Sequence, residues 1–443
     1  MNRVFNFQAG PEIVANAMQG GGVFQHLRGG LDGRRCGHED RRMLSLPVEP
    51  ALRAEWDALH ALRNDPRILP LVEAAAGSEL QLQKQLRRDF SDPVVRAAIS
   101  LVELRRRAGV KFSRASQMWF DRRGLEQSTS EPVARHKAQR FYGSVADFCC
   151  GIGADSIALA ANCDVVAIDS SPLACLRTTW NAAVYECDAR VSVVCGDVEL
   201  FEASDRLVHI DPDRRAHGST RSVHIEDYVP GLPYLQAAAS RLKGGAIKLS
   251  PAANFGGKFA AAEIELVSLR GECKEAVVWF GALAGTAPWR ATVLPSGETL
   301  AGDPMEFFVD QSPPQRYLYD PDPAVVRAGL VDAAASRLGL CRLDREEEYL
   351  TGSAWVESPF VQGFELIAEL PNNPREIRQY FRASRAGQVE VKCRRIPIVA
   401  ESIRRKLPLP GDEPLVLIFA RLGGRARALV GRRLATVTHH EPA

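Results

Sequence analysis

The sequence predicts an α/β protein whose central domain is a seven-stranded, mainly parallel sheet, with helices before it and a smaller α+β domain after it. Three observations lead to this fold class. Apolar residues recur at helical spacing from about residue 49 to residue 104. From residue 142 onward, short runs rich in Val and Ile alternate with helical segments, and the last stretch mixes both patterns. A chain of 443 residues is also too long for one compact core, so several domains are expected.

The first two predicted segments are residues 1–45 and 46–140. Residues 1–45 contain a Gly-rich stretch, GGGVFQHLRGGLDGRR, without a sustained apolar period, so we expect a loop or a poorly ordered N-terminus there. Residues 46–140 predict a helical domain, because LRAEWDALHAL and ELQLQKQLRRDF place apolar residues three and four positions apart. The pairs Asp65-Pro66 and Asp92-Pro93 mark breaks between its helices.

Residues 141–310 predict the domain that contains the sheet. Strands separated by helical crossovers form a parallel sheet with helices on both faces, and the last two predicted strands close with a hairpin. The predicted strands lie in the runs SVADF, DVVAID, RVSVVCGD, RLVHIDPD, GAIKLSP, EIELVSL and EAVVWFG.

Residues 311–443 predict the second, α+β domain. The segment SPPQRYLYDPDPAVVRAGL, from Ser312, is typical of a linker followed by a helix start, and a succession of helix, strand, helix, strand and strand follows it. From Pro371 to Ala443 there are fifteen Lys and Arg against six Asp and Glu, a balance of +9, so the rest of the chain carries −7. This asymmetry fits either a polyanion-binding module or a solvated helical face with surplus arginine.

The composition excludes several classes of protein. The hydrophobic fraction of 46% and the charged fraction of 25% are ordinary for a globular protein and exclude disordered and fibrous classes. The ten cysteines form no C-x-x-C pair, so we expect no zinc or other metal site and mostly buried, reduced thiols. No apolar run is long enough for a membrane span or a secretory signal, so we expect a cytoplasmic protein without a membrane partner.

The segment VADFCCGIGADSIALAANCDVVAIDSSP is the most informative one. A strand that ends in Asp147 is followed by Gly151 and Gly153, and the next strand ends in Asp169. Glycines let the backbone approach a ligand closely, and an acid after the second strand can accept both ribose hydroxyls. The third glycine of the dinucleotide motif is replaced by Ser156, and no P-loop is present. The pattern therefore favours a nucleoside ligand without a pyrophosphate.

On these residues the sequence resembles the class I S-adenosylmethionine-dependent methyltransferases, which have a Rossmann-like fold. The resemblance implies S-adenosylmethionine as the cofactor, with Asp169 at the ribose and Asp197 near the adenine amine. The adjacent Cys149 and Cys150 are interpreted as small packing residues under the ligand rather than as catalytic thiols. The implied cofactor-binding residues lie in the loops after the first three strands and are Asp147, Cys149, Gly151, Gly153, Asp155, Asp169, Ser170, Asp197 and Val198.

The fourth predicted strand ends in HIDPDRR. Members of the class that methylate amines carry [DNS]-P-P-[YFW] there, so the resemblance implies Asp211 and Pro212 as catalytic residues, although the aromatic residue is missing. Arg214 and Arg215 can stack on a base or hold a phosphate, or they can form salt bridges within the loop. Lys248, at the end of the fifth strand, either contacts a substrate phosphate or is an exposed strand-end lysine. Glu126 and Gln127, in GLEQST, either cover the cofactor or help bind the base, or they belong to an ordinary helix cap region.

Residues 112–141 and 177–198 resemble the RNA cap trimethylguanosine synthases and their bacterial relatives, with N-A-x-x-Y before the third strand and IDPDRR in place of SPPW. Together with LYDPDPAVVRAGL, EVKCRRIPI and ALVGRRL, residues 110–435 are similar to a bacterial family of class I methyltransferases with a THUMP-like C-terminal domain. The resemblance implies methylation of a base nitrogen, guanine N2 favoured, in a structured tRNA or rRNA.

Three other functions stay open on the sequence alone. The chain can be a methyltransferase of a protein or a small molecule, which leaves the basic C-terminal module without a use. It can methylate adenine in DNA, which the missing aromatic residue after Asp211-Pro212 disfavours. It can also be a non-catalytic RNA-binding protein built on a methyltransferase scaffold.

Overall fold

The computed structural model describes residues 5–7, 49–75, 78–214 and 223–434. The chain divides into two compact units, residues 1–260 with 279–284 and residues 261–278 with 285–443. Apart from strand β1 (Phe5–Phe7), the predicted N-terminal loop of residues 1–45 lies outside the described residues. The predicted domain boundaries after residues 45, 140 and 310 stay predictions.

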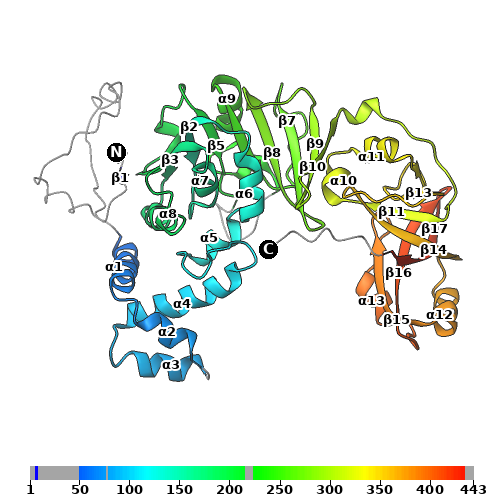
Figure 1. Ribbon diagram of the computed structural model, residues 1–443, viewed down its shortest axis with the longest axis horizontal. Helices are drawn as coiled ribbons and strands as arrows, with labels where there is room; N and C mark the ends of the chain where they lie inside the picture. The colour runs from blue at the N-terminus through cyan, green and yellow to red at the C-terminus, as the bar shows by residue number, and fades with distance from the viewer. Residues whose placement is uncertain (1–4, 8–48, 76–77, 215–222, 435–443) are drawn as a thin grey trace, which may run out of the picture. The chain divides into compact units, whose positions relative to one another are not determined.

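A ten-stranded sheet contains all seven predicted strands, in the order β4-β3-β2-β5-β6-β8-β7 (Figure 1). Strand β2 pairs in parallel with β3 and β5, β3 with β4, and β5 with β6. The α/β fold class with a class I methyltransferase sheet is therefore confirmed. The strands are β2 (Gly143–Phe148), β3 (Cys163–Asp169), β4 (Val191–Cys195), β5 (Leu207–Ile210), β6 (Gly244–Leu249), β7 (Glu263–Leu269) and β8 (Glu272–Gly281).

Three further strands extend this sheet beyond the predicted seven. β1 pairs antiparallel with β4, so residues 5–7 are a strand where the sequence predicted a loop. β9 (Trp289–Leu294) runs parallel to β7 and pairs antiparallel with β10 (Glu298–Gly302). The β9–β10 hairpin turns at Gly297, whose φ of +74° lies in the region that favours glycine.

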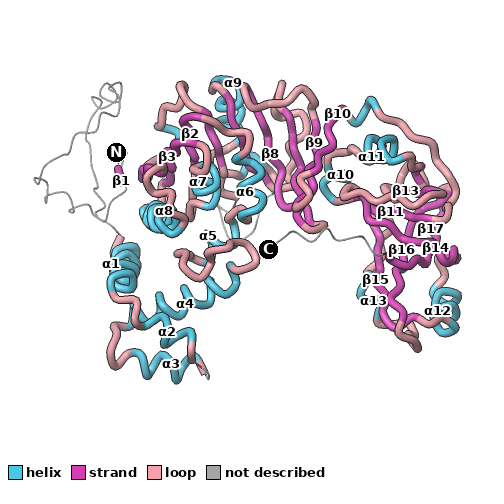
Figure 2. The backbone as a smooth tube through the Cα atoms, viewed as in Figure 1, coloured by secondary structure: helices cyan, strands magenta, loops and turns pink. Residues whose placement is uncertain are grey.

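The centre of the sheet is buried on both faces, as expected where helices cover a parallel sheet. Figure 2 draws the helices in cyan beside the magenta strands. Every residue of β5 and β6 is buried. Gly245 has no room for a side chain, because a Cβ there would lie 2.0 Å from the carbonyl oxygen of Val208. The covering helices are α7 (Ala154–Leu159), α8 (Pro172–Val184) and α9 (Leu232–Arg241).

The helical segment forms as the sequence predicts. Asp65 and Pro66 separate the first two helices, and Pro93 lies in the first turn of a helix that begins at Asp92, a position that tolerates proline. The helices are α1 (Pro50–Asn64), α2 (Ile68–Glu73), α3 (Glu79–Leu86), α4 (Asp92–Ala108), α5 (Arg122–Gln127) and α6 (Glu131–Ala138).

These helices share a hydrophobic core with the first half of the sheet domain. The core continues from α1, α2 and α4 to Ile152 of the glycine loop and to Leu176 and Trp180 of α8. The rings of Trp119 and Trp180 meet edge to face, with their centroids 4.6 Å apart. The N-terminal helices are thus packed directly against the elements that carry the predicted cofactor motif.

The second sheet has the order β12-β13-β11-β14-β17-β16-β15. The predicted succession of helix, strand, helix, strand and strand is found as α12 (Pro374–Ala383), β15 (Ala386–Cys393), α13 (Ala400–Arg404), β16 (Glu413–Leu422) and β17 (Arg425–Arg433). The elements before them are β11 (Tyr317–Pro321), α10 (Pro323–Arg327), α11 (Val331–Leu338), β12 (Cys341–Arg342), β13 (Leu350–Gly352) and β14 (Val361–Pro371).

The linker predicted from Ser312 is wrong for part of its length. Residues 317–321 form β11, which lies between β13 and β14 with Leu318 and Tyr319 buried. Two Asp-Pro pairs, at the end of β11 and directly after it, resemble a loop in sequence, yet Asp322 caps α10 by accepting a hydrogen bond from the backbone N–H of Ala324 at 2.8 Å. The helix start in this segment is therefore confirmed.

Strand β16 separates two cores in the second unit. Its residues Leu415, Leu417 and Phe419 pack with Ile377 and Phe381 of α12. The intervening Val416, Ile418 and Ala420 belong to a second core on the other face. This alternation is the two-residue period of a strand covered on both sides. In the described part of the chain, no helix combines the length and the apolarity needed to cross a membrane.

Candidate active site

A cavity of about 350 Å³ lies at the carboxyl ends of β2, β3, β4 and β5, a volume within the ordinary range for ligand sites. The first unit alone supplies its lining. The predicted site residues that line it are Cys149, Gly151, Asp155, Asp169, Ser170, Asp197, Val198, Asp211, Pro212 and Arg214. The structure therefore brings together most of the residues that the sequence singled out.

The glycine loop and the acid after β3 are hydrogen-bonded to each other. The backbone N–H of Gly151 donates to Oδ2 of Asp169 at 2.9 Å, and that of Ser171 donates to Oδ1 at 2.9 Å. Gly151 has a φ of +59° and no atom within 4 Å of the place where a Cβ would stand. Burial raises the pKa of Asp169 to about 6, although the two backbone hydrogen bonds oppose this shift.

The loop after β4 contributes Asp197 and Val198 to the cavity. Asp197 caps the short 3₁₀ helix Val198–Leu200, because its Oδ1 accepts a hydrogen bond from the backbone N–H of Glu199 at 3.0 Å. The carbonyl oxygen of Val198 accepts a hydrogen bond from the hydroxyl of Tyr234 at 3.2 Å. Both contacts hold the loop in a fixed position at the end of the strand.

Asp147 and Gly153 do not line the cavity, in contrast to the predicted direct contacts with the cofactor. Asp147 is fully buried and accepts hydrogen bonds from the hydroxyl of Ser156 and from Nδ1 of His209, the latter at 2.7 Å. A Cβ at Gly153 would approach Cγ2 of Thr178 to 2.9 Å. The two residues therefore support the glycine loop from within the protein, because their contacts are with protein atoms and not with the cavity.

Asp155 lines the cavity and also belongs to a buried network. The other members of this network are Thr129, Lys137, Asp147 and His209. The carboxylate of Asp155 accepts a hydrogen bond from Thr129 at 2.7 Å and pairs with the ammonium of Lys137 at 2.9 Å. Lys137 also lies 3.3 Å from Nε2 of His209. Burial alone would raise the pKa of Asp155, but the charge of Lys137 holds it below the ordinary value for an aspartate.

The two adjacent cysteines have the properties expected of packing residues. Burial, followed by the negative charge of Asp169, raises the pKa of Cys149 and of Cys150. Both thiols are therefore protonated and weakly nucleophilic at neutral pH. The nine cysteines in the described residues are all free thiols.

Asp211 directly follows the carboxyl end of β5 and is paired with Lys248. The backbone N–H of Asp211 donates to the carbonyl oxygen of Phe148 at 3.1 Å, which links the ends of β5 and β2. The ammonium of Lys248 donates to Oδ2 of Asp211 at 2.6 Å and to the carbonyl oxygen of Gln127 at 3.1 Å. Lys248 is 7% exposed, so it is not the exposed strand-end lysine of the alternative interpretation. Its contact with a substrate phosphate stays a prediction.

The loop after Asp211 contains two predicted substrate-binding arginines, of which only the first lies in the described part of the chain. Arg214 lines the cavity and forms no ion pair with an acid of the described residues, which leaves its guanidinium available to a ligand. Arg215 lies outside the described residues. Asp213 forms an ion pair with Arg123 and accepts a hydrogen bond from Nε2 of Gln127 at 3.1 Å. Helix α5 is thereby joined to this loop across the cavity.

Sequence reasoning missed Arg177, a cavity residue on α8. Its guanidinium is 4% exposed and forms ion pairs with Glu55 of α1 at 2.6 Å and with Asp121 at 3.2 Å. Asp121 in turn caps α5 by accepting a hydrogen bond from the backbone N–H of Gly124 at 2.8 Å. An arginine on a helix has no distinguishing local pattern in the sequence, so only its burial in the structure identifies Arg177 as part of the site.

The N-A-x-x-Y motif of α8 joins segments that are distant in the sequence. The side-chain amide of Asn181 donates to the carbonyl oxygens of Trp119 and Ile152 at 3.0 and 2.9 Å. Its Oδ1 accepts the backbone N–H of Trp119 at 2.7 Å. The hydroxyl of Tyr185 donates to Glu131 at 3.1 Å. This motif therefore ties the chain before β2 to the glycine loop.

Comparisons with known proteins identify the family. A family model of RNA cap guanine-N2 methyltransferases matches residues 142–226, and a THUMP domain-like model matches residues 361–433. An uncharacterized S-adenosylmethionine-dependent methyltransferase of Mycobacterium tuberculosis, present in strains CDC 1551 and H37Rv, is 36% identical over 333 residues, which are 72% of this chain and 91% of the relative. This chain belongs to the S-adenosylmethionine-dependent methyltransferases. Its cofactor is S-adenosylmethionine.

The fold of this methyltransferase also has a solved counterpart. A crystal structure of a protein from Porphyromonas gingivalis W83, whose methyltransferase activity is a prediction, superposes with a TM-score of 0.64 at 20% identity. The superposition covers 87% of this chain and 98% of that protein. Likeness at this identity is evidence for the fold.

The residues of the cavity fit S-adenosylmethionine. The open space beside Gly151 admits a ligand against the backbone, and Asp169 can accept hydrogen bonds from two ribose hydroxyls. Asp197 and Val198 line the cavity one strand further along, and the resemblance to class I methyltransferases implies adenine near Asp197. The assignment of these individual residues to the cofactor stays a prediction.

Proposed function

We propose that this methyltransferase transfers a methyl group to a base nitrogen of a structured tRNA or rRNA, with guanine N2 as the favoured atom. The observation that carries the proposal is Asp211-Pro212 at the mouth of the cofactor cavity. The match of residues 142–226 to RNA cap guanine-N2 methyltransferases and the THUMP-like match in the C-terminal unit support the base and the RNA respectively.

Asp211 has the geometry of a group that orients an amine. Lys248 donates to Oδ2, and no described residue donates to Oδ1, so one carboxylate oxygen can accept an N–H of the target base. The carbonyl oxygen of Pro212 can accept a second N–H. S-adenosylmethionine supplies an electrophilic methyl group for in-line attack, which requires alignment more than acid or base strength. The carboxylate of Asp211 stabilises the positive charge that develops on the nitrogen.

The arginines after Asp211 complete the proposed substrate site. Arg214 lines the cavity beside Asp211 and takes the place of the aromatic residue found in amine-methylating relatives. A guanidinium plane can stack on a base in a similar way. We assign Arg214 and Arg215 to the base or to a neighbouring phosphate.

Mass spectrometry of nucleosides tests the proposed function. RNA from cells with and without the gene is digested, and the methylated nucleosides are compared. Purified protein is then incubated with RNA from the deletion strain and isotope-labelled S-adenosylmethionine. We expect the missing nucleoside to reappear with the wild type and to be reduced with Asp211→Asn. Asp205→Asn, an exposed aspartate outside the cavity, is the matched control and is expected to act as the wild type.

Two results would contradict the proposal. Methylation of proteins or small molecules without any change in RNA would favour the alternative substrate classes. RNA binding without methyl transfer under any condition would favour a non-catalytic RNA-binding protein.

A further inference from the structure

The basic residues of the C-terminal unit fall into two groups. All fifteen Lys and Arg between residues 371 and 443 lie in the described part of the chain. Ten of them form ion pairs, such as Arg394 with Asp320 at 2.6 Å, Arg404 with Glu401 at 2.9 Å and Arg427 with Glu369 at 2.8 Å. Local acids therefore neutralise most of the positive charge that the sequence shows.

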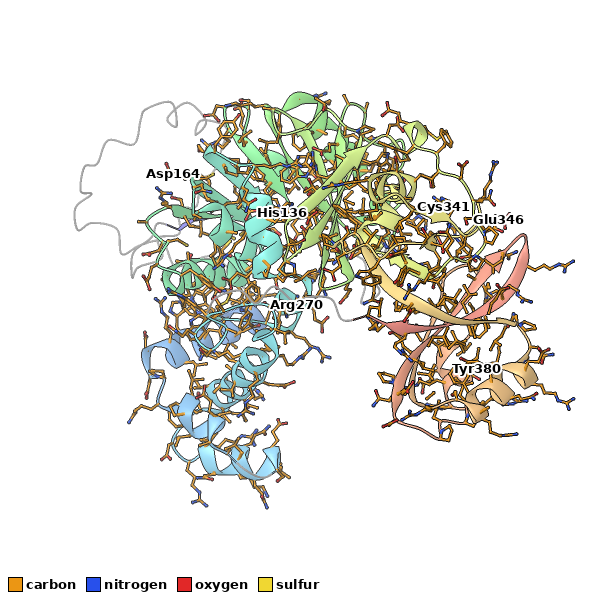
Figure 3. All side chains as sticks on the ribbon, turned by 45° about the vertical axis from the view of Figure 1, so that its right-hand side comes forward. His136, Asp164, Arg270, Cys341, Glu346 and Tyr380 are labelled. Carbon is orange, nitrogen blue, oxygen red and sulfur yellow. The ribbon has the colours of Figure 1, made fainter. Side chains whose placement is uncertain are left out.

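Helix α12 carries three of the five basic residues that have no ion pair within the described residues. Arg375, Arg378 and Arg382 are all exposed and are three and four positions apart, so they lie along one face of the helix. A different face anchors the helix, because Ile377 and Phe381 are buried in the core to which β16 contributes. Tyr380, which is labelled in Figure 3, marks this helix in the C-terminal unit.

Arg382 lies in the last turn of the helix, where a cation is favourable, but the other two arginines do not serve the stability of the helix. Arg375 lies in the first turn, where the positive end of the helix dipole disfavours a cation. Arg378 and Arg382 are four positions apart, a spacing at which like charges destabilise a helix. An uncompensated row of guanidinium groups is therefore better explained by an external anion.

We propose that Arg375, Arg378 and Arg382 of α12 form a contact surface for the phosphate backbone of the RNA substrate. This inference rests on the proposed function and narrows the RNA-binding surface from the whole basic segment to one helix face. Seven residues of helix span roughly 10 Å along the axis, a length over which a nucleic-acid duplex presents several phosphates. Guanidinium groups bind phosphate oxygens in pairs, which suits a backbone contact without sequence preference.

The chemistry of the surface favours RNA over a membrane. A membrane-binding helix needs large apolar side chains beside its basic residues. None of the exposed large hydrophobic residues in the described part of the chain lies on α12. Glu376 is the single acid of the helix, and it follows Arg375 directly.

The test measures binding of unfractionated tRNA and deproteinised ribosomal RNA to the full-length protein over a range of salt concentrations. The variant is Arg375→Gln with Arg378→Gln and Arg382→Gln. The control removes three ion-paired arginines, as Arg404→Gln with Arg405→Gln and Arg432→Gln. We expect the α12 variant to bind at least about tenfold more weakly at low salt, with a salt slope shallower by about two to three.

The control and a stability measurement separate a contact role from a general effect. We expect the control to retain most of the salt slope and the α12 variant to keep or raise the midpoint of thermal unfolding. Equal salt slopes for the wild type and the α12 variant would overturn the inference, as would an equal loss in the control. Loss of binding to phosphatidylserine vesicles without loss of RNA binding would also overturn it, in favour of a membrane surface.

The same experiment distinguishes this inference from the proposed function. If the wild type binds no RNA, the proposed function fails and the inference fails with it. If the wild type binds and methylates RNA and the α12 variant does so equally well, only the inference about α12 fails.

Discussion

Beneath the cofactor cavity of the first unit, charged side chains form a buried network, whereas around α13 of the second unit they form exposed pairs. The side chains of Lys137 and Asp155 are 2% and 9% exposed, and those of Arg404 and Glu401 are 56% and 49% exposed. A buried pair is held by its surroundings and cannot be replaced by water, whereas an exposed pair exchanges readily with solvent. The buried network therefore fixes the geometry beneath the cavity, whereas the exposed pairs constrain their surroundings little.

The largest expected effect concerns stability in the buried network. Lys137→Met leaves the carboxylate of Asp155 buried without its cation, which should lower the free energy of unfolding by about 3–5 kcal/mol. Urea unfolding of the full chain measures this loss. The double variant with Asp155→Asn has no unpaired buried carboxylate, so it should regain part of the lost free energy of unfolding. A loss below about 1 kcal/mol in the single variant is the size expected for an exposed pair. It would mean that the buried network does not differ from the exposed pairs in stability.

The second effect concerns the partly buried pair of Asp211 and Lys248. Asp211→Ala should reduce turnover by more than about a hundredfold, the size expected when one preorganised contact to the transition state is lost. Cofactor affinity should stay close to that of the wild type, because Asp211 belongs to a different loop from the cofactor residues. Asp211→Asn keeps the shape and one acceptor and should be partly active. Methyl transfer at the wild-type rate in Asp211→Ala would refute the amine-orienting role.

The third effect concerns cofactor affinity at Asp169. Asp169→Ala removes the acceptor for two ribose hydroxyls and should weaken binding by about 1.5–3 kcal/mol, or roughly ten- to a hundredfold. Isothermal calorimetry with S-adenosylhomocysteine measures this change. Asp164→Ala, on the same strand but outside the cavity, serves as the control. Unchanged affinity in Asp169→Ala would contradict the ribose assignment.

A smaller effect follows from the pKa of Asp169, which burial raises to about 6. Below this pH a growing fraction of the carboxyl groups is protonated, and a protonated group cannot accept from both hydroxyls. Affinity should therefore fall as the pH is lowered through 6, by up to about tenfold per pH unit. The dependence should disappear in Asp169→Asn, and a flat profile in the wild type would argue that the carboxyl does not titrate in this range.

The smallest effect is expected in the second unit. Glu401→Gln breaks the exposed pairs with Arg404 and Arg405, and the free energy of unfolding should change far less than in Lys137→Met. Urea unfolding, as for Lys137→Met, measures both variants on one scale. A loss comparable to that of Lys137→Met would remove the contrast between the two units.

Local patterns were sufficient to predict most of the fold. The seven predicted strands of the first sheet follow from short Val- and Ile-rich runs, and the loop after β2 follows from the glycines at the end of that strand. Strand β11 was missed because the Asp-Pro pairs beside it have the composition of a loop. Its burial depends on neighbours that are distant in the sequence.

The pairing of side chains in the site could not be predicted in the same way. Lys248 was placed at a strand end but not against Asp211, which is 37 residues away. Arg123 and Asp213 are 90 residues apart, and neither has a local signature of the other. The charge count of the C-terminal unit likewise could not separate paired arginines from the three on α12, because pairing depends on tertiary structure.

Arg177 has one further consequence for the enzyme. It joins Glu55 of α1 to Asp121, which begins the helix that closes over the cavity. A ligand that stabilises α5 is therefore expected to stabilise its link to α1 as well, and amide hydrogen exchange in α1 should slow when the cofactor binds.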